Sequence, residues 1–186
     1  MKDLSKRLDE SLHEDSGVEQ SFLATIDGFA YDWTSFKRGG AAAVRLAKKV
    51  GYEKAKLVAS EAKDPYVASY LLSFVKNWSS PTKVFHGTSS KRADAIEKDG
   101  LRLGPGPNGF RSGGTMGIWL STDRSTSETF ARMAAEHDGS DAVILVVTKV
   151  PGISVLVPDP DMFVRDEPYC TAAVATEAID ARHVRR

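Results

Sequence analysis

The sequence predicts an α+β fold in which a small helical region, residues 1–80, precedes a β-rich domain, residues 81–186. Apolar residues of the first region recur at helical spacing, whereas the second region contains short apolar, β-branched runs that are typical of strands. A polar break at residues 77–81 separates these two compositions. Together the three observations place the helices before the sheet along the chain.

Three helices are expected in the first region. A leucine at every fourth position predicts a short helix over residues 4–12. Residues 41–62 suit one helix, or two short ones divided at Gly51, because glycine is a poor helix former. Asp64 and Pro65 have the residue types of an N-cap and a first helical position, so a further helix should run from there to residue 78.

The aromatic residues of this region allow two interpretations, a base-stacking surface or ordinary packing. Most of them lie at helical spacing, which favours packing. They are Tyr31, Trp33, Phe36, Tyr66, Tyr70, Phe74 and Trp78.

Short strands and helices alternate in the second region. Strands are predicted at residues 83–86, 118–121, 142–150, 153–157 and 169–179. A helix over residues 90–99 should be capped by Ser89 or Ser90 and terminated by Gly100. Another helix should begin at a capping box formed by Ser125 and Glu128 and continue past Ala134.

Composition excludes several classes of protein. The 25 basic and 25 acidic residues balance, which argues against a dedicated nucleic-acid binder although not against a local basic patch. A single cysteine, Cys170, excludes an internal disulfide and disfavours a cysteine-based zinc site. No metal is expected, because no cluster of His, Asp or Glu residues has the spacing of metal ligands. No apolar run approaches the roughly 18–20 residues that span a bilayer, and none near the N-terminus resembles a secretory signal. We therefore expect a cytoplasmic site of action and no membrane partner.

The glycine-rich stretch at residues 104–109 matches the G-x-G-x-x-G pattern of dinucleotide-binding proteins but lacks its chemistry. Pro105 and Pro107 have no backbone N–H to offer a pyrophosphate, and no amphipathic helix follows. We expect a loop over a ligand or a plain surface loop here.

The functional signal is the order of motifs between residues 86 and 133. His-Gly-Thr at residues 86–88 closes a strand, and a short helix leads to Gly-Leu-Arg at residues 100–102. Gly-Ile-Trp-Leu-Ser-Thr at residues 117–122 then precedes Ser-Glu-Thr-Phe at residues 127–130. This set resembles the His-Tyr-Glu type of ADP-ribosyltransferase, the poly(ADP-ribose) polymerases and diphtheria-toxin-like enzymes. That family has His-Gly-Ser/Thr, Gly-Leu-Arg, Gly-Ile-Tyr-Phe-Ala-Asp and Ser-x-Ser-Ala-x-Tyr in the same order.

The resemblance implies a split β-sheet with a cleft for NAD+ between two packed, mostly antiparallel sheets. It assigns His86 to a ribose hydroxyl, and Gly87 and Ser127 to the nicotinamide carboxamide. Phe130 and Trp119 would form two walls of a slot for the pyridinium ring, where the family usually has tyrosines.

Two further residues are assigned to NAD+ by the same resemblance. Arg102 would reach the adenosine side or the pyrophosphate, and Thr88 belongs to the first motif. The family also places a glutamate on a late strand, where a carboxylate stabilises the oxocarbenium-like state of bond cleavage. Glu177 is the first candidate for this glutamate and Glu167 the alternative, while a gapless match would put residues 172–175 there and leave the position without a carboxylate.

The implied function is mono-ADP-ribosyl transfer from NAD+ to a macromolecular acceptor, a protein rather than a nucleic acid, as in a toxin or effector. The first alternative is an NAD glycohydrolase, in which water is the acceptor. A degenerate domain that binds a nucleotide or a partner without turnover is a second. RNA 2′-phosphotransfer ranks below these, because only Arg102, Arg111 and Arg124 offer cations near the cleft. From its position alone, the helical region is a candidate for target recognition or for gating the cleft.

Overall fold

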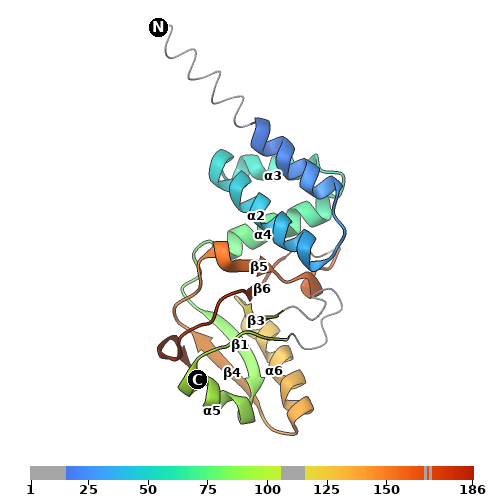
Figure 1. Ribbon diagram of the computed structural model, residues 1–186. Coiled ribbons are helices and arrows are strands. Elements are labelled where there is room, and N and C mark those ends of the chain that lie inside the picture. The colour runs from blue at the N-terminus through green and yellow to red at the C-terminus, as the bar shows by residue number, and fades with distance from the viewer. Residues whose placement is uncertain (1–15, 106–115, 166, 168) are drawn as a thin grey trace, which may run out of the picture.

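The computed structural model describes residues 16–105, 116–165, 167 and 169–186 of the chain (Figure 1). Helices occupy one end of the molecule, and an antiparallel sheet with two further helices occupies the other. The predicted α+β class is confirmed. None of the helices in these residues has the length and apolar character needed to cross a bilayer.

Four helices build the first region from residue 16 onwards, where its description begins. They are a helix over residues 16–27, α2 (Trp33–Val50), α3 (Tyr52–Ser60) and α4 (Pro65–Trp78). Gly51, at a φ of 82°, divides α2 from α3, so the weak point seen in the sequence is a real helix boundary. The Asp64 carboxylate caps α4 by accepting hydrogen bonds from the backbone N–H groups of Tyr66 and Val67, as predicted. The predicted helix over residues 4–12 lies outside the described residues.

Aromatic residues of these helices pack inside the protein. Phe36, Tyr70, Phe74 and Trp78 are each at most 1% exposed, which confirms the packing interpretation for these four. Phe163, from the second region, joins them with its ring 5.2 Å from that of Tyr70. The helical region and the sheet therefore share one hydrophobic core.

The second region forms a sheet whose strands run in the order β5-β6-β3-β1-β4-β7, with every pair antiparallel and the short β2 paired to β3 outside this order. Its elements are β1 (Val84–Ser89), α5 (Ser90–Asp99), β2 (Gly104–Pro105), β3 (Met116–Ser121), α6 (Arg124–Asp138), β4 (Ala142–Val147), β5 (Leu156–Pro158), β6 (Ala172–Ala175) and β7 (Val184–Arg185). One pair alone, Phe85 with Ser121, joins β1 to β3. The strands thus form one continuous sheet, which is narrow where β1 meets β3. The two separately packed sheets that were expected are not seen.

Several predicted strand boundaries are wrong. The strand predicted at residues 153–157 begins as a 3₁₀ turn (Ile153–Val155), in which the backbone N–H of Val155 donates to the carbonyl of Gly152, and becomes β5 only at Leu156. The predicted last strand, residues 169–179, is reduced to β6, which ends where the partner residues of β3 and β5 end. By contrast, the strand predicted at residues 83–86 continues to Ser89 because β4 offers partners along its whole length.

The capping box predicted for α6 is also wrong. Asp123 is the N-cap, and its carboxylate accepts hydrogen bonds from the backbone N–H groups of Ser125 and Thr126. Glu128 lies instead beside Arg124, with 3.4 Å between the carboxylate oxygen and Nε. A charged carboxylate directly before the helix satisfies the free N–H groups and the helix dipole, so it displaces the serine from the cap position.

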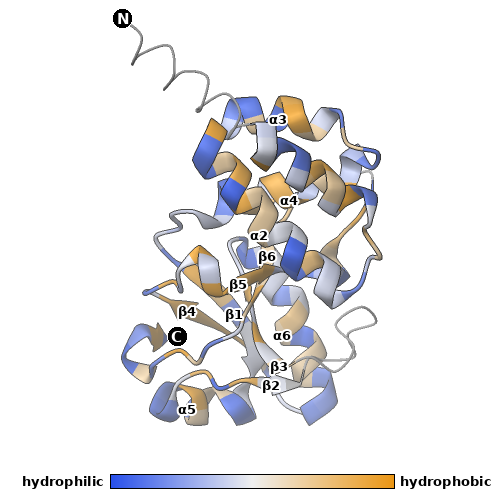
Figure 2. Ribbon diagram, turned by 45° about the horizontal axis from the view of Figure 1, so that its top comes forward, coloured by the Kyte–Doolittle hydropathy of each residue, from blue (hydrophilic) through white to orange (hydrophobic). Residues whose placement is uncertain are grey.

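Polar contacts tie α4 to the segment between β5 and β6. The Tyr70 hydroxyl donates to the carbonyl of Asp159 at 2.6 Å, and the backbone N–H of Cys170 donates to the Ser73 hydroxyl at 2.6 Å. Asn77 donates to the carbonyl of Cys170 at 3.2 Å. Figure 2 shows apolar residues on α4 and on the strands β5 and β6 beside it. These hydrogen bonds fix the orientation of the helices on the edge of the sheet.

Asp159 is a buried carboxyl at this junction. Its residue is 1% exposed, one oxygen accepts from the backbone N–H of Asp161 at 3.0 Å, and the other makes no hydrogen bond to any described residue. Burial raises the pKa of Asp159 from 3.8 to about 7, with the nearby Asp161 charge acting in the same direction. The carboxyl is therefore neutral in the folded protein over much of the acid range.

The titration of Asp159 predicts that stability falls as pH rises. Between the unfolded pKa near 3.8 and the folded pKa near 7, the unfolded chain releases a proton that the folded chain keeps, so the free energy of unfolding decreases up to about pH 7 and then levels off. Asp159→Asn keeps the acceptor for Asp161 and should remove this loss, which is on the order of a few kcal/mol. Urea unfolding from pH 4 to pH 8 measures it. Equal pH profiles for wild type and Asp159→Asn would contradict the prediction.

Candidate functional site

A cavity of about 760 Å³ lies between the two halves of the sheet, with walls from β1, β3, α5 and α6. It forms beside the single pair that joins β1 to β3. Its volume lies within the range of roughly 300–1,000 Å³ typical of small-molecule sites. Six of the residues singled out in the sequence line it, namely His86, Gly87, Thr88, Arg102, Trp119 and Phe130.

His86 links the two sides of the cavity. It lies in the middle of β1, and its Nδ1 is 2.8 Å from the backbone carbonyl oxygen of Trp119 in β3. A carbonyl oxygen can only accept, so Nδ1 carries the proton and donates it. The ring is thereby held in one orientation across the junction between the strands.

Burial keeps the His86 imidazole neutral. Desolvation lowers the pKa of His86 below its ordinary value of 6.5, and the neighbouring Arg92 charge acts in the same direction, against the opposing hydrogen bond to Trp119. A neutral ring with its proton on Nδ1 leaves Nε2 as a bare acceptor. His86 can therefore accept a hydrogen bond from a ligand hydroxyl at neutral pH.

Gly87 allows helix α6 to lie directly on β1. A Cβ atom added at Gly87 would stand 2.1 Å from the Ser127 carbonyl oxygen and 2.5 Å from the Ala131 nitrogen, and 3.1 Å from the Cβ of Phe130. The close approach that glycine permits here is thus that of the α6 backbone. This contact fixes Ser127 and Phe130 next to the His-Gly motif.

The Ser127 hydroxyl is a buried polar group without a hydrogen bond to any described residue. Its residue is 1% exposed and packs beside Gly87, but it is not among the residues that line the cavity. An unpartnered buried hydroxyl costs about 1–3 kcal/mol, so this position lowers the stability of the fold unless a partner reaches it.

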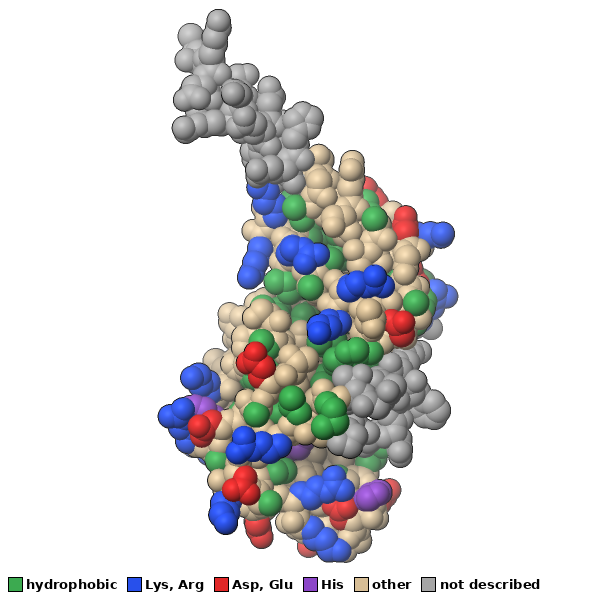
Figure 3. All heavy atoms as spheres, in the orientation of Figure 1, with side chains coloured by type: hydrophobic (Ala, Val, Ile, Leu, Met, Phe, Trp, Pro, Cys, Tyr) green, Lys and Arg blue, Asp and Glu red, His purple; other side chains and the backbone are tan. Residues whose placement is uncertain are grey.

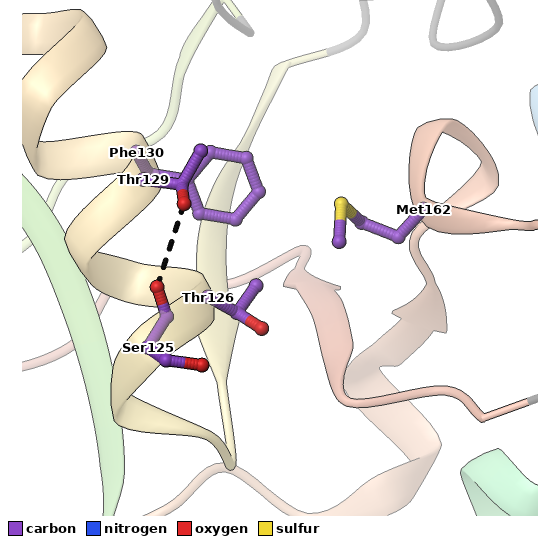
Figure 4. A pocket seen from close by; sticks show the side chains of 5 residues that line it. All are labelled: Ser125, Thr126, Thr129, Phe130 and Met162. Atoms are coloured by element: carbon purple, nitrogen blue, oxygen red, sulfur yellow. Dashed lines mark hydrogen bonds between the residues drawn. The ribbon is translucent and has the colours of Figure 1, made fainter.

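Phe130 and Trp119 enclose the cavity from α6 and β3. Phe130 also borders a smaller hollow of about 180 Å³, where Met162 lies across from Thr126 (Figure 4). The side chain therefore lines both spaces. Both aromatic residues are half-buried, which leaves part of each ring accessible from the cavity.

Polar residues that the sequence analysis did not single out complete one end of the cavity. Lys91 and Arg92 from α5 and His137 from α6 line it. Arg92 and the Ser89 hydroxyl bind the Asp138 carboxylate at 2.7 and 2.5 Å, and with His137 they hold the pKa of this carboxyl well below its usual range. Ser89 precedes α5 without capping it through its side chain. The helical spacing of Arg92, Ile96 and Asp99 was the signal that could have predicted this wall.

Neither glutamate candidate lies in the cavity wall. Glu177 is exposed just beyond the end of β6, and Glu167 is exposed in the turn where it pairs with Val164. Residues 172–175 are the buried strand β6, so the gapless match brings no carboxylate to the site. Among the described residues that line the cavity, Asp99 is the only carboxylate.

The glycine-rich stretch is described only in part. Gly104 and Pro105 pair with Gly117 and Met116 as the short β2–β3 ladder, and Gly104 lies at the cavity wall. The rest of the stretch, including Arg111, lies outside the described residues. Arg124 begins α6 and is not part of the wall. Over the described part of the chain no group of three or more His, Cys, Asp or Glu side chains is arranged to hold a metal.

Two comparisons with known proteins identify no relative of this chain. No protein-family model matches the chain, and a search of curated proteins also returns no match.

Gly87→Ala should destabilise the protein by about 1–3 kcal/mol, because two backbone atoms of α6 occupy the space of the new methyl group. Urea unfolding measures the change. Gly152→Ala is the matched control, since the nearest atom to its added Cβ is 3.8 Å away, and it should lie within about 0.5 kcal/mol of wild type. Equal effects of the two substitutions would show that α6 does not depend on this contact.

NMR should find His86 neutral at pH 7, with the proton on Nδ1. Long-range ¹H–¹⁵N correlation spectra report the protonation state of each ring nitrogen, and a His86→Gln variant assigns the resonance among the four histidines. The titration midpoint should fall below 6.5. A midpoint above this value, or a proton on Nε2 instead, would refute the assigned geometry.

Proposed function

We propose that the chain is an NAD-dependent mono-ADP-ribosyltransferase with the split-sheet fold of that family. It would cleave the bond between nicotinamide and ribose and transfer ADP-ribose to a macromolecular acceptor, a protein rather than a nucleic acid. The observation that supports this best is the presence of a neutral His86, Trp119 and Phe130 in the wall of one cavity.

Each part of the cavity suits a part of NAD+. The bare Nε2 of His86 can accept a hydrogen bond from a ribose hydroxyl. The rings of Trp119 and Phe130 offer aromatic faces to a cationic pyridinium. Ser127, which the sequence resemblance assigns to the carboxamide, has an unpartnered hydroxyl next to Gly87 but lies outside the cavity wall. The sheet is continuous but narrows to a single pair between β1 and β3, and this narrow junction supports the comparison with a split-sheet fold.

The reaction would separate charge at the ribose carbon. The carbon–nitrogen bond breaks, its electron pair goes to the nicotinamide nitrogen, and positive charge develops on the ribose. An acceptor nucleophile then forms the new bond to the same carbon and loses its proton. A carboxylate stabilises such a state, and Asp99 is the one that the described cavity wall offers. Glu177, the candidate from the sequence, would have to approach from outside that wall.

A second candidate is a domain that binds NAD+ or a related nucleotide without turning it over. The exposure of both glutamates outside the cavity favours it, because neither of them then lies in the cavity wall where the family's chemistry needs a carboxylate. Transfer and binding differ in turnover alone, so one set of experiments separates them.

Incubation of the full chain with NAD+ labelled on its adenylate part and a cell lysate should transfer the label to macromolecules. His86→Ala should abolish labelling, since it removes the acceptor for the ribose. Phe130→Leu should weaken NAD+ binding about tenfold, measured by calorimetry, because an aromatic contact contributes about 0.5–1.5 kcal/mol beyond its buried area. Release of nicotinamide without labelled macromolecules would identify a glycohydrolase instead.

Substitution of each carboxylate in turn shows which of them stabilises the positive charge on the ribose. Asp99→Asn should reduce turnover at least 100-fold with unchanged NAD+ affinity if it is the stabilising group. Glu177→Gln and Glu167→Gln are matched isosteric tests of the other candidates. Measurable NAD+ binding together with no turnover in wild type would establish the binding domain and reject the transferase.

A further inference from the structure

Helix α2 carries basic residues without acidic ones. Its sequence from Trp33 to Val50 contains Lys37, Arg38, Arg45, Lys48 and Lys49 and no Asp or Glu. All five side chains belong to exposed residues. The chain as a whole has equal numbers of basic and acidic residues, so this helix departs from the rest of the protein.

The five cations share one face of the helix. At 100° per residue they fall within an arc of about 120°, and the same arc contains only Thr34 and Ala41 besides them. The buried residues of α2, among them Phe36, Ala43 and Leu46, lie on the opposite side against the core. From Lys37 to Lys49 the face runs about 18 Å along the helix axis.

Helices α3, α5 and α6 mix the two signs, whereas α4 carries a single charge, Lys76. In α3 Lys56 lies 2.7 Å from Glu53, and in α6 Arg124 lies beside Glu128. Helix α5 contains three basic and three acidic residues along Ser90–Asp99. Mixed faces of this kind serve solubility. Figure 3 shows Lys and Arg side chains over the helical end of the molecule, with fewer Asp and Glu among them.

We propose that this basic face of α2, defined by Lys37, Arg38, Arg45, Lys48 and Lys49, binds the phosphate backbone of duplex nucleic acid. Double-stranded DNA presents one negative charge per roughly 1.7 Å of its axis, so a face about 18 Å long meets several phosphates at once. Binding of this kind is independent of base sequence.

The composition of the face argues for a duplex over the other polyanions. Protein interfaces depend on aromatic or apolar anchors, and the arc contains none. Single strands are held through stacking of their bases on aromatic side chains, which the arc also lacks. What remains is cations in two groups, Lys37 with Arg38 and Arg45 with Lys48 and Lys49, and these suit a phosphate backbone. The face belongs to the helical region rather than to the cavity, so the proposal holds whether or not NAD+ is turned over.

Fluorescence anisotropy of the full chain with labelled 20-base-pair duplexes, one of DNA and one of RNA, tests the proposal without NAD+ present. Binding at 50 mM salt should weaken steeply as salt rises, with a slope of log K against log salt of about −3 to −5. Arg45→Glu with Lys48→Glu should weaken binding more than tenfold. The milder pair Arg45→Ala with Lys48→Ala should reduce the slope by about 2.

The matched control is Lys56→Glu with Lys98→Glu, which changes the net charge equally on two other helices. It should leave duplex binding within about twofold of wild type, since the charge change lies outside the proposed face. Circular dichroism confirms that each variant folds. No duplex binding at 50 mM salt, an equal loss in the control, or tighter binding of poly-glutamate or of single strands would each overturn the proposal. Comparison of the two affinities shows whether the face prefers a DNA or an RNA duplex.

Discussion

The site depends on the contact between the backbone of α6 and β1 at Gly87. Two backbone atoms of the helix occupy the space that any other side chain would need, so helix and strand lie closer than side chains normally allow. This contact places Ser127 and Phe130 beside the strand that carries His86. The spatial arrangement of the proposed NAD+ pocket thus follows from the absence of one carbon atom.

The second determinant is the narrow junction of the sheet. With one pair joining β1 to β3, the strands separate and their facing edges become walls of the cavity. Backbone groups along such edges need other partners, and the Trp119 carbonyl finds one in the His86 ring. The hydrogen bond that compensates for the lost strand pairing is the same one that sets the tautomer of the histidine. Near one end of the cavity, the Asp138 carboxylate contacts Ser89, Arg92 and His137.

Local signals in the sequence predicted much of this arrangement. The order of the motifs anticipated that His86, Trp119 and Phe130 would meet, and Gly51, Asp64 and Gly100 marked helix ends correctly. These features depend on a few neighbouring residues, which is why a single sequence contains them.

Features set by distant contacts escaped prediction. The first half of α2 was missed because Gly39 and Gly40 lower helix propensity, yet a Cβ at either would stand 2.7 Å from Leu71 or Pro158, so packing requires the glycines. The cap of α6 depended on competition between Asp123 and Ser125, and the length of β6 on its two neighbouring strands. The position of Glu177 depends on where β6 ends, so no local pattern could place it.

The common core of the helices and the sheet has a consequence for how this protein can be inherited. Tyr70 and Ser73 of α4 are bonded to the segment between β5 and β6, and Phe163 from that segment is inserted among the helical aromatics. A recombination breakpoint near residue 80 would expose to solvent, on both fragments, apolar surface that is buried in the intact protein. A gene fusion that transfers the cavity to another protein must therefore include the helical region as well.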